Sequence, residues 1–259
     1  MESRAVLGVG VNATDYPEAT DLVRRWAERH ESRFVTAAAA YNLVMAHDDT
    51  AYRDVLNRAD LVTPDGVPLV WTLRALGVAH PSRVYGPDLT WKVCEMAAQQ
   101  GIPVGFYGST DAVLGKLIDN VKARHPQLDV VYRYAPPFRP LSLVEEVEVD
   151  RAIEESGAAI VFVGLGAPKQ DRWIALRHGS LPAVMLAVGA AFDFLAGTKP
   201  QAPRLLQRVG LEWFFRLVSE PKRLWRRYLV GNPRFTWYVG SQLLRRRRSY
   251  PAPTFRRRS

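Results

Sequence analysis

The sequence is poor in the residues from which disulfides and metal sites are built. Cys94 is the single cysteine, so no disulfide can form within the chain. It lies in a helical pattern, and we expect a buried thiol in a reducing compartment. The five histidines are scattered, and none pairs with a cysteine or an acid at metal-ligand spacing. The sequence therefore predicts no metal site and no bound cofactor.

Long apolar runs are also lacking. No run approaches the roughly 20 residues that a membrane-spanning helix needs, and the N-terminal residues lack the apolar core of a signal peptide. The hydrophobic content of 47% is ordinary for a soluble globular protein. The 259 residues suit one large domain, or one domain with an appendage. We therefore expect a cytoplasmic protein, whose membrane contacts would be peripheral.

The net charge of +9 is concentrated at one end of the chain. Residues 201–259 hold 15 Lys and Arg against 2 Asp and Glu, whereas residues 1–200 have a net charge of −4. Such asymmetry indicates a polyanionic partner for the C-terminal segment, either nucleic acid or an anionic membrane surface.

Short runs rich in Val and Ile alternate with helical patterns up to about residue 200. The candidate strands are 5–11, 33–37, 60–63, 102–108, 128–134, 158–166 and 183–189, and helical patterns cover 17–30, 52–59, 67–76, 89–100, 111–125, 143–156 and 169–178. This alternation predicts an α/β fold with a Rossmann-like, mostly parallel sheet and helices on both faces. Ligands of such sheets bind at the carboxyl ends of the strands, so the strand-to-helix junctions are the candidate sites.

The C-terminal appendage, residues 201–259, differs in character from the α/β domain that we expect over residues 1–200. It carries three of the seven tryptophans among its arginines, and within it only 234–240 resembles a strand. Apolar aromatic residues beside arginine are typical of helices that lie at a membrane surface. We predict a helical basic appendage that contacts the membrane, with a disordered tail from about residue 245.

The junction "ADLVTPDGVPLVW" places an acid and a glycine, Asp65 and Gly66, where a strand gives way to a helix. Asp65 could serve only as the N-cap of that helix, or it could take part in chemistry. In "SRVYGPDLTW", Arg83 could bind a phosphate, and Asp88 has the position of an N-cap.

The junction "FVGLGAPKQDRW" combines glycines with polar residues. Gly164 and Gly166 precede a helix whose first turn holds Lys169 and Gln170. Backbone N–H groups at such a helix start can bind an anion, although a tight turn with solvated side chains has the same pattern. We favour a substrate-binding role. In "VGAAFDFLAGTKPQAP", Asp193 lies between two phenylalanines, and structure and function explain it equally well.

These motifs, together with "GLEWFFRLVSEPKRLWRRY", occur in an order and spacing that resemble the WecG/TagA/CpsF glycosyltransferases. The resemblance covers about residues 5–230. It implies an enzyme that moves a sugar, usually from a UDP-sugar, to a saccharide on undecaprenyl diphosphate in bacterial surface polysaccharide synthesis. It also implies an inverting, metal-independent reaction at the inner face of the plasma membrane, where the protein would be peripheral. A homo-oligomer is compatible with the sequence.

The resemblance assigns roles to individual residues. It implies that Asp65 is the general base, with Thr36, Arg83 and Gln170 also catalytic and Gly66 and Asp88 in contact with substrate. The family usually has an asparagine shortly after the threonine; here the run Ala37–Ala40 stands there, and Asn42 is the nearest candidate. In the appendage the resemblance implies substrate contacts for Arg216, Arg223 and Arg226. The appendage would then complete the active site of a catalytic domain formed by residues 1–200.

The chemistry of inverting transfer agrees with this assignment. A carboxylate removes the proton of the attacking hydroxyl and typically contributes about 10²–10⁴-fold. Cations or helix N-termini must stabilise the charge that develops on the leaving diphosphate, and arginines can do so in place of a metal. Solvation and attraction to lipid better explain Arg227 and the arginine runs 245–248 and 256–258.

Two other classes of protein remain open from the residues alone. A nucleic-acid-binding protein could use the arginine-rich segment, but the acidic body disfavours this and we expect no nucleic-acid partner. An NAD-dependent oxidoreductase would rest on "GVGVNA", a weak match to the dinucleotide fingerprint, in which Gly8 and Gly10 are better explained as strand glycines.

Overall fold

A computed structural model describes residues 1–249 of the chain. Its centre is a sheet of six parallel strands in the spatial order β4-β3-β8-β7-β5-β6. The strands are β3 (Arg33–Ala38), β4 (Leu61–Pro64), β5 (Val104–Gly108), β6 (Val130–Tyr134), β7 (Ile160–Gly164) and β8 (Val184–Ala187). After β4 the chain crosses the sheet to β5, so a crevice opens at the carboxyl ends of the central strands. The predicted parallel α/β sheet is confirmed.

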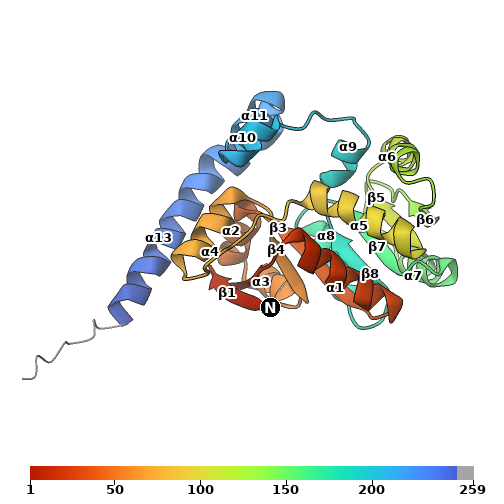
Figure 1. Cartoon of the computed structure of the whole chain (residues 1–259), viewed down its shortest axis with the longest axis horizontal. Coiled ribbons are helices and arrows are strands. Elements are labelled where there is room, and N and C mark those ends of the chain that lie inside the picture. Colours follow the sequence, from red (N-terminus) through yellow and green to blue (C-terminus); the bar gives the residue numbers. More distant parts are fainter. Residues whose placement is uncertain (250–259) are drawn as a thin grey trace, which may run out of the picture.

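Helices cover both faces of this sheet (Figure 1), as the alternating side chains of the strands require. One face, with Phe106, Phe162 and Leu186, packs against α1 (Tyr16–Glu28), α5 (Gly86–Gln100), α6 (Asp111–Arg124) and α9 (Ala191–Leu195). The other face, with Tyr107 and Val163, packs against α7 (Leu143–Ser156) and α8 (Lys169–Arg177). Cys94 is fully buried on the first face, as expected of a structural thiol.

The N-terminal run predicted as one strand is instead a separate antiparallel hairpin, β1 (Glu2–Val6) and β2 (Val9–Ala13). Leu7 and Gly8 both have positive φ and reverse the chain between the two strands. The side chain of Asn12 then accepts a hydrogen bond from the Val62 N–H, 2.8 Å away, which places the hairpin beside β4. Because Gly8 and Gly10 lie in this hairpin, they do not form a dinucleotide-binding turn after a parallel strand.

Three helices complete this side of the body: α2 (Ala40–Asp48), α3 (Thr50–Asn57) and α4 (Val67–Ala75). The sequence patterns did not predict α2, because alanines run through the end of β3 into the helix start. Asn42 stabilises the N-terminus of α2, because its side-chain oxygen accepts a hydrogen bond from the Ala39 N–H at 3.2 Å.

The appendage is helical, as predicted, and its last helix is longer than expected. Its elements are α10 (Arg204–Arg208), α11 (Glu212–Ser219), α12 (Pro221–Trp225), the π-helical turn η1 (Arg226–Val230) and α13 (Gly231–Ser249). The strand considered for 234–240 is wrong, because this stretch lies within α13. The tail predicted to be disordered from about residue 245 is helical up to Ser249, and the rest lies outside the described residues.

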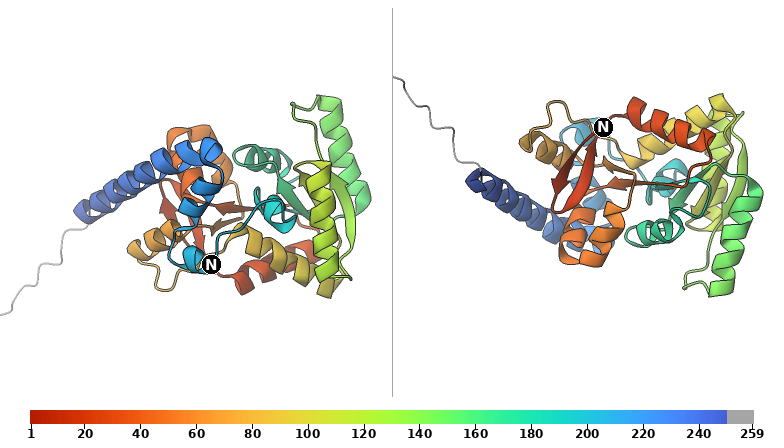
Figure 2. Two further views of the ribbon diagram at one scale, coloured as in Figure 1. Left: turned by 90° about the horizontal axis from the view of Figure 1, so that it is seen from above. Right: turned by 90° about the horizontal axis from the view of Figure 1, so that it is seen from below.

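Helix α13 docks on the body beside α2, on the side away from β6 (Figures 1 and 2). Phe235 and Val239, one helical turn apart, are buried with the hairpin, α2 and α4 in one apolar cluster. The side chain of Gln242 accepts from the Leu7 N–H and donates to the Ala5 carbonyl, at 2.9 and 2.7 Å. The appendage therefore shares a core with the body. Within residues 1–249, none of the helices combines the length and apolarity needed to cross a membrane.

Replacing Phe235 with alanine should lower the free energy of unfolding by about 3–5 kcal/mol, because a large buried ring leaves a cavity. Replacing Trp237, which is 73% exposed on the same helix, should change it by less than about 0.5 kcal/mol. Urea unfolding of both variants measures this, and equal effects would contradict the docking of α13.

Candidate active site

Asp65 follows the last residue of β4, at the carboxyl edge of the sheet. Its backbone N–H donates to the Ala38 carbonyl at 3.0 Å, which continues the pairing of β4 with β3. Its side chain does not cap the helix that follows, because Gly66 is the N-cap of α4. Instead, the carboxylate accepts a hydrogen bond from the N–H of Gly86, the first residue of α5, at 3.2 Å. The explanation of Asp65 as the cap of its own helix is therefore wrong.

The carboxyl of Asp65 is tuned by its surroundings. Burial raises its pKa to about 6. The positive charge of Arg83 and the bond from Gly86 lower the pKa, whereas the charge of Glu212 raises it. A carboxyl with this pKa is ionised at neutral pH and is still basic enough to accept a proton.

Arg83 connects Asp65 to the appendage. Its Nε donates to the backbone carbonyl of Asp65 at 2.6 Å, and its Nη2 pairs with the Glu212 carboxylate on α11 at 2.5 Å. The guanidinium also lies over the ring of Tyr85, 4.3 Å from its centre. Both charged side chains of the pair are largely buried, with 19% and 13% of their side-chain surface exposed.

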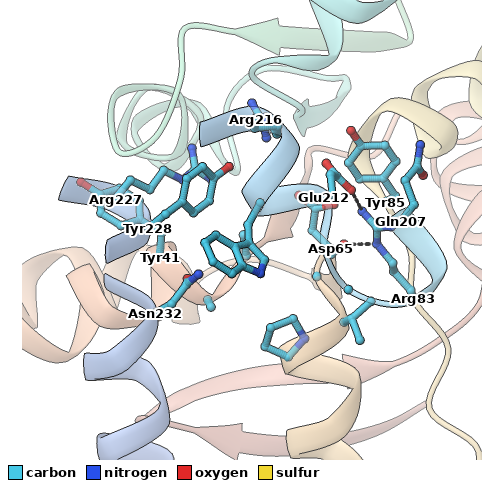
Figure 3. A pocket seen from close by; sticks show the side chains of 17 residues that line it. Tyr41, Asp65, Arg83, Tyr85, Gln207, Glu212, Arg216, Arg227, Tyr228 and Asn232 are labelled. Carbon is cyan, nitrogen blue, oxygen red and sulfur yellow. Dashed lines mark hydrogen bonds and ion pairs between the residues drawn. The ribbon is translucent and has the colours of Figure 1, made fainter. Parts of the chain in front are cut away.

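Asp65 lies where two cavities meet. The first opens between α4 and the appendage, and its labelled side chains surround Asp65 from both sides (Figure 3). The second lies at the carboxyl ends of β3, β5, β7 and β8. The cavities share Tyr41, Asp65, Tyr85, Arg216 and Arg227.

Arg227 faces both cavities, contrary to its expected place on a solvated surface. Its Nε is buried and has no hydrogen-bond partner within residues 1–249. Burial lowers its pKa from the ordinary value, and the neighbouring charge of Arg216 acts in the same direction. Arg226, by contrast, is exposed and lies over the ring of Trp225. The two arginines are adjacent in η1 but point in different directions, so that only Arg227 of this pair lines the cavities.

The second cavity holds several of the predicted residues, namely Asn42, Gly164, Gly166, Gln170, Asp193, Arg216 and Arg223. Gly164 must be glycine, because a Cβ there would lie 2.4 Å from the Phe192 ring. The N–H of Gly166 donates to the Gln170 side chain at 3.0 Å. That backbone N–H is therefore already hydrogen-bonded within the protein. We had expected it to be available to an anion, and it is not.

The remaining predicted residues have other surroundings. Asp88 does not cap α5, whose N-cap is Tyr85; it accepts a hydrogen bond from the Tyr16 hydroxyl at 3.2 Å. Asp193 pairs with Lys199 at 3.0 Å. Lys169 lines a hollow beside the second cavity rather than the cavity itself. Arg223 pairs with Glu220 at 2.6 Å, at the rim of the second cavity.

Thr36 belongs to a buried polar network. Its side chain is fully buried, and its hydroxyl donates to Asp171 at 2.8 Å. The Tyr52 hydroxyl donates to the other oxygen of Asp171 at 2.9 Å and accepts from Asn42 at 3.2 Å. Burial raises the pKa of Asp171 to about 6, and the bonds from Thr36 and Tyr52 oppose this shift. Thr36 therefore contacts α8 through Asp171 and lines neither of the two cavities.

The sequence patterns missed Glu212, Tyr85, Phe138 and the role of Arg227. Glu212 carried a signal, since it is one of two acids among the 15 basic residues of the appendage. Phe138 is 92% exposed at the rim of the second cavity, but nothing in its local pattern distinguishes it from a loop residue. Within residues 1–249, no three His, Cys, Asp or Glu side chains converge to hold a metal ion.

A buried carboxyl with a raised pKa, in a pocket at the carboxyl edge of a parallel sheet, defines a candidate catalytic site. The chain belongs to the glycosyl transferase WecG/TagA/CpsF family, whose model matches residues 4–249. It is therefore a glycosyltransferase. It is 31% identical over 209 residues to the N-acetylglucosaminyldiphosphoundecaprenol N-acetyl-beta-D-mannosaminyltransferase of Bacillus spizizenii, covering 80% of this chain and 79% of that protein.

Replacing Thr36 with valine should destabilise the protein by about 1.5–3 kcal/mol, because Asp171 loses a hydrogen bond to its buried charge. Thr36→Ser keeps the hydroxyl and should retain most of this stability. Urea unfolding and sugar-transfer assays on both variants separate the two roles. Unchanged stability with lost turnover in Thr36→Val would instead support a direct role of Thr36 in the reaction.

Proposed function

We propose that this glycosyltransferase moves a sugar from a UDP-sugar to N-acetylglucosamine linked to undecaprenyl diphosphate, with inversion at the transferred carbon. The observation that carries the proposal is the carboxyl of Asp65, with a pKa of about 6, at the junction of two cavities. The name of the Bacillus relative supplies the acceptor class. Saccharides linked to undecaprenyl diphosphate are used for polymers of the bacterial cell surface, so we place the reaction at the inner face of the plasma membrane.

Each cavity suits one substrate. The second cavity lies in the crevice at the carboxyl ends of the strands, where nucleotides bind in sheets of this kind, and we assign the UDP-sugar to it. The first cavity has apolar walls from Val67, Pro68 and Trp213 beside the appendage. We assign the acceptor sugar and the start of its lipid to this cavity.

Asp65 then acts as the general base. It removes the proton from the acceptor hydroxyl while that oxygen forms a bond to the anomeric carbon, and the bond from that carbon to the UDP oxygen breaks. The electron pair leaves with UDP, so negative charge grows on the diphosphate. Arg216 and Arg227 border both cavities, and their guanidinium groups can stabilise this charge. The reaction would then need no metal ion.

The outer side of the appendage suits a membrane surface. Leu205, Phe214, Val218 and Leu229 are each more than half exposed, within a segment rich in arginine. Apolar side chains beside basic residues bind the interface of anionic bilayers. We propose that this surface holds the enzyme where its lipid-linked acceptor lies.

Replacing Asp65 with asparagine should lower kcat by about 10²-fold or more, because the base is lost. UDP binding and folding should persist. Since burial raises the pKa of Asp65, its ionised form costs stability, so the variant should gain stability relative to the natural protein as pH rises through about 6. In the natural protein kcat/KM should fall about tenfold per unit below this pH.

Transfer assays with UDP-sugars and the lipid-linked acceptor, combined with thermal unfolding across pH, measure both effects. Full turnover by Asp65→Asn would show that the base lies elsewhere.

Replacing Arg227 with alanine should lower kcat by about 10²-fold or more, because the leaving diphosphate loses a cation. Its neighbour Arg226 is exposed, and Arg226→Ala should change turnover little. Steady-state kinetics on the two variants compare adjacent residues of equal charge. A larger loss in Arg226→Ala would contradict the assignment of Arg227 and favour the residue implied by the sequence resemblance.

A further inference from the structure

Glu212 is an acid in a basic segment, and it lies at the centre of the site rather than on its surface. It is the first residue of α11. Its carboxylate pairs with Arg83, while the same guanidinium donates to the backbone carbonyl of Asp65 (Figure 3). One chain of contacts therefore joins the loop after β4 to the first residue of α11.

We propose that Glu212 is a positioning residue for the transfer reaction: by pairing with Arg83 it holds the appendage over Asp65 and sets the charge that surrounds this carboxylate. The proposal rests on the role of Asp65 as the base. Glu212 need not touch a substrate, since it acts through Arg83.

The charges around Asp65 explain why an acid is needed here. Arg83, Arg216 and Arg227 bring three positive charges, and Asp65 alone would face all of them. In such surroundings a carboxylate is stabilised in its ionised form and becomes a weak base. Glu212 satisfies Arg83 and acts on Asp65 as a like charge, which raises the pKa of Asp65. A net positive charge is still left for the diphosphate.

A second ion pair between the appendage and the body provides a matched control. Arg234 on α13 pairs with Asp48 at the end of α2, at 2.8 Å. Both side chains of this pair are about 40% exposed, at 42% and 38%, and neither lines the two cavities. Asp48→Asn therefore removes a docking contact without changing the charge around Asp65.

The test is the pH dependence of kcat/KM for the full-length natural protein, Glu212→Gln and Asp48→Asn, with thermal unfolding of each. Glutamine has the size of glutamate without its charge. We expect the acidic limb of Glu212→Gln to move to lower pH by about one unit, with kcat lowered about tenfold because the base is weaker. Asp48→Asn should keep the natural profile. Glu212→Asp, which keeps the charge, should restore the natural acidic limb even if its shorter reach lowers kcat.

Three outcomes would overturn the proposal. An unmoved acidic limb in folded Glu212→Gln would mean that its charge does not act on Asp65. Equal losses in Glu212→Gln and Asp48→Asn would mean that docking in general, and not this residue, supports turnover. If Glu212→Gln does not fold, an acidic limb in Glu212→Asp that is displaced from the natural one would equally overturn it. The Asp65→Asn variant separates these failures from failure of the proposed function, since an active Asp65→Asn rejects the base itself.

Discussion

The paired contacts of Arg83 hold the two parts of this site together. A guanidinium has donors in a fixed fork, so it can bind a backbone carbonyl with one edge and a carboxylate with another. Here it binds the carbonyl of Asp65 and the carboxylate of Glu212 at once. The first cavity has walls from both the sheet side and the appendage. Its walls therefore come from two parts of the chain that this contact and the buried face of α13 bring together.

The same arrangement explains why a mildly acidic body carries a strongly basic appendage. The arginines of the appendage fall into two groups, those that face the cavities and those that face outward. Arg216 and Arg227 face the cavities, where a diphosphate would supply the missing negative charge, whereas Arg226 faces outward. The buried Nε of Arg227 has no hydrogen-bond partner within residues 1–249, and leaving a buried polar group unpaired is costly. This supports the proposal that Arg227 meets an anionic substrate. The membrane contact that we propose would instead use the arginines that face outward.

Local patterns in the sequence predicted the elements whose formation depends on neighbours in the chain. The seven helical patterns and the six central strands follow from periodicity and from bounding glycines and prolines. Elements that depend on distant partners were missed or misjudged. The sequence pattern of the β1–β2 hairpin predicts a single strand, and the alanines at the start of α2 give no helical pattern. Residues 234–240 are helical, and there Phe235 and Val239 pack into a cluster formed by residues far away in sequence.

The sequence by itself determined the α/β sheet, the position of Asp65 at its carboxyl edge and the concentration of arginine in the last segment. Only the tertiary structure decided which groups surround Asp65. That choice depends on the rotation of η1 and on the docking of α11 and α13, which bring Arg227 and Glu212 beside a residue about 150 positions earlier. The pKa of a carboxyl depends on burial and nearby charge, and both are properties of this packing rather than of any local motif.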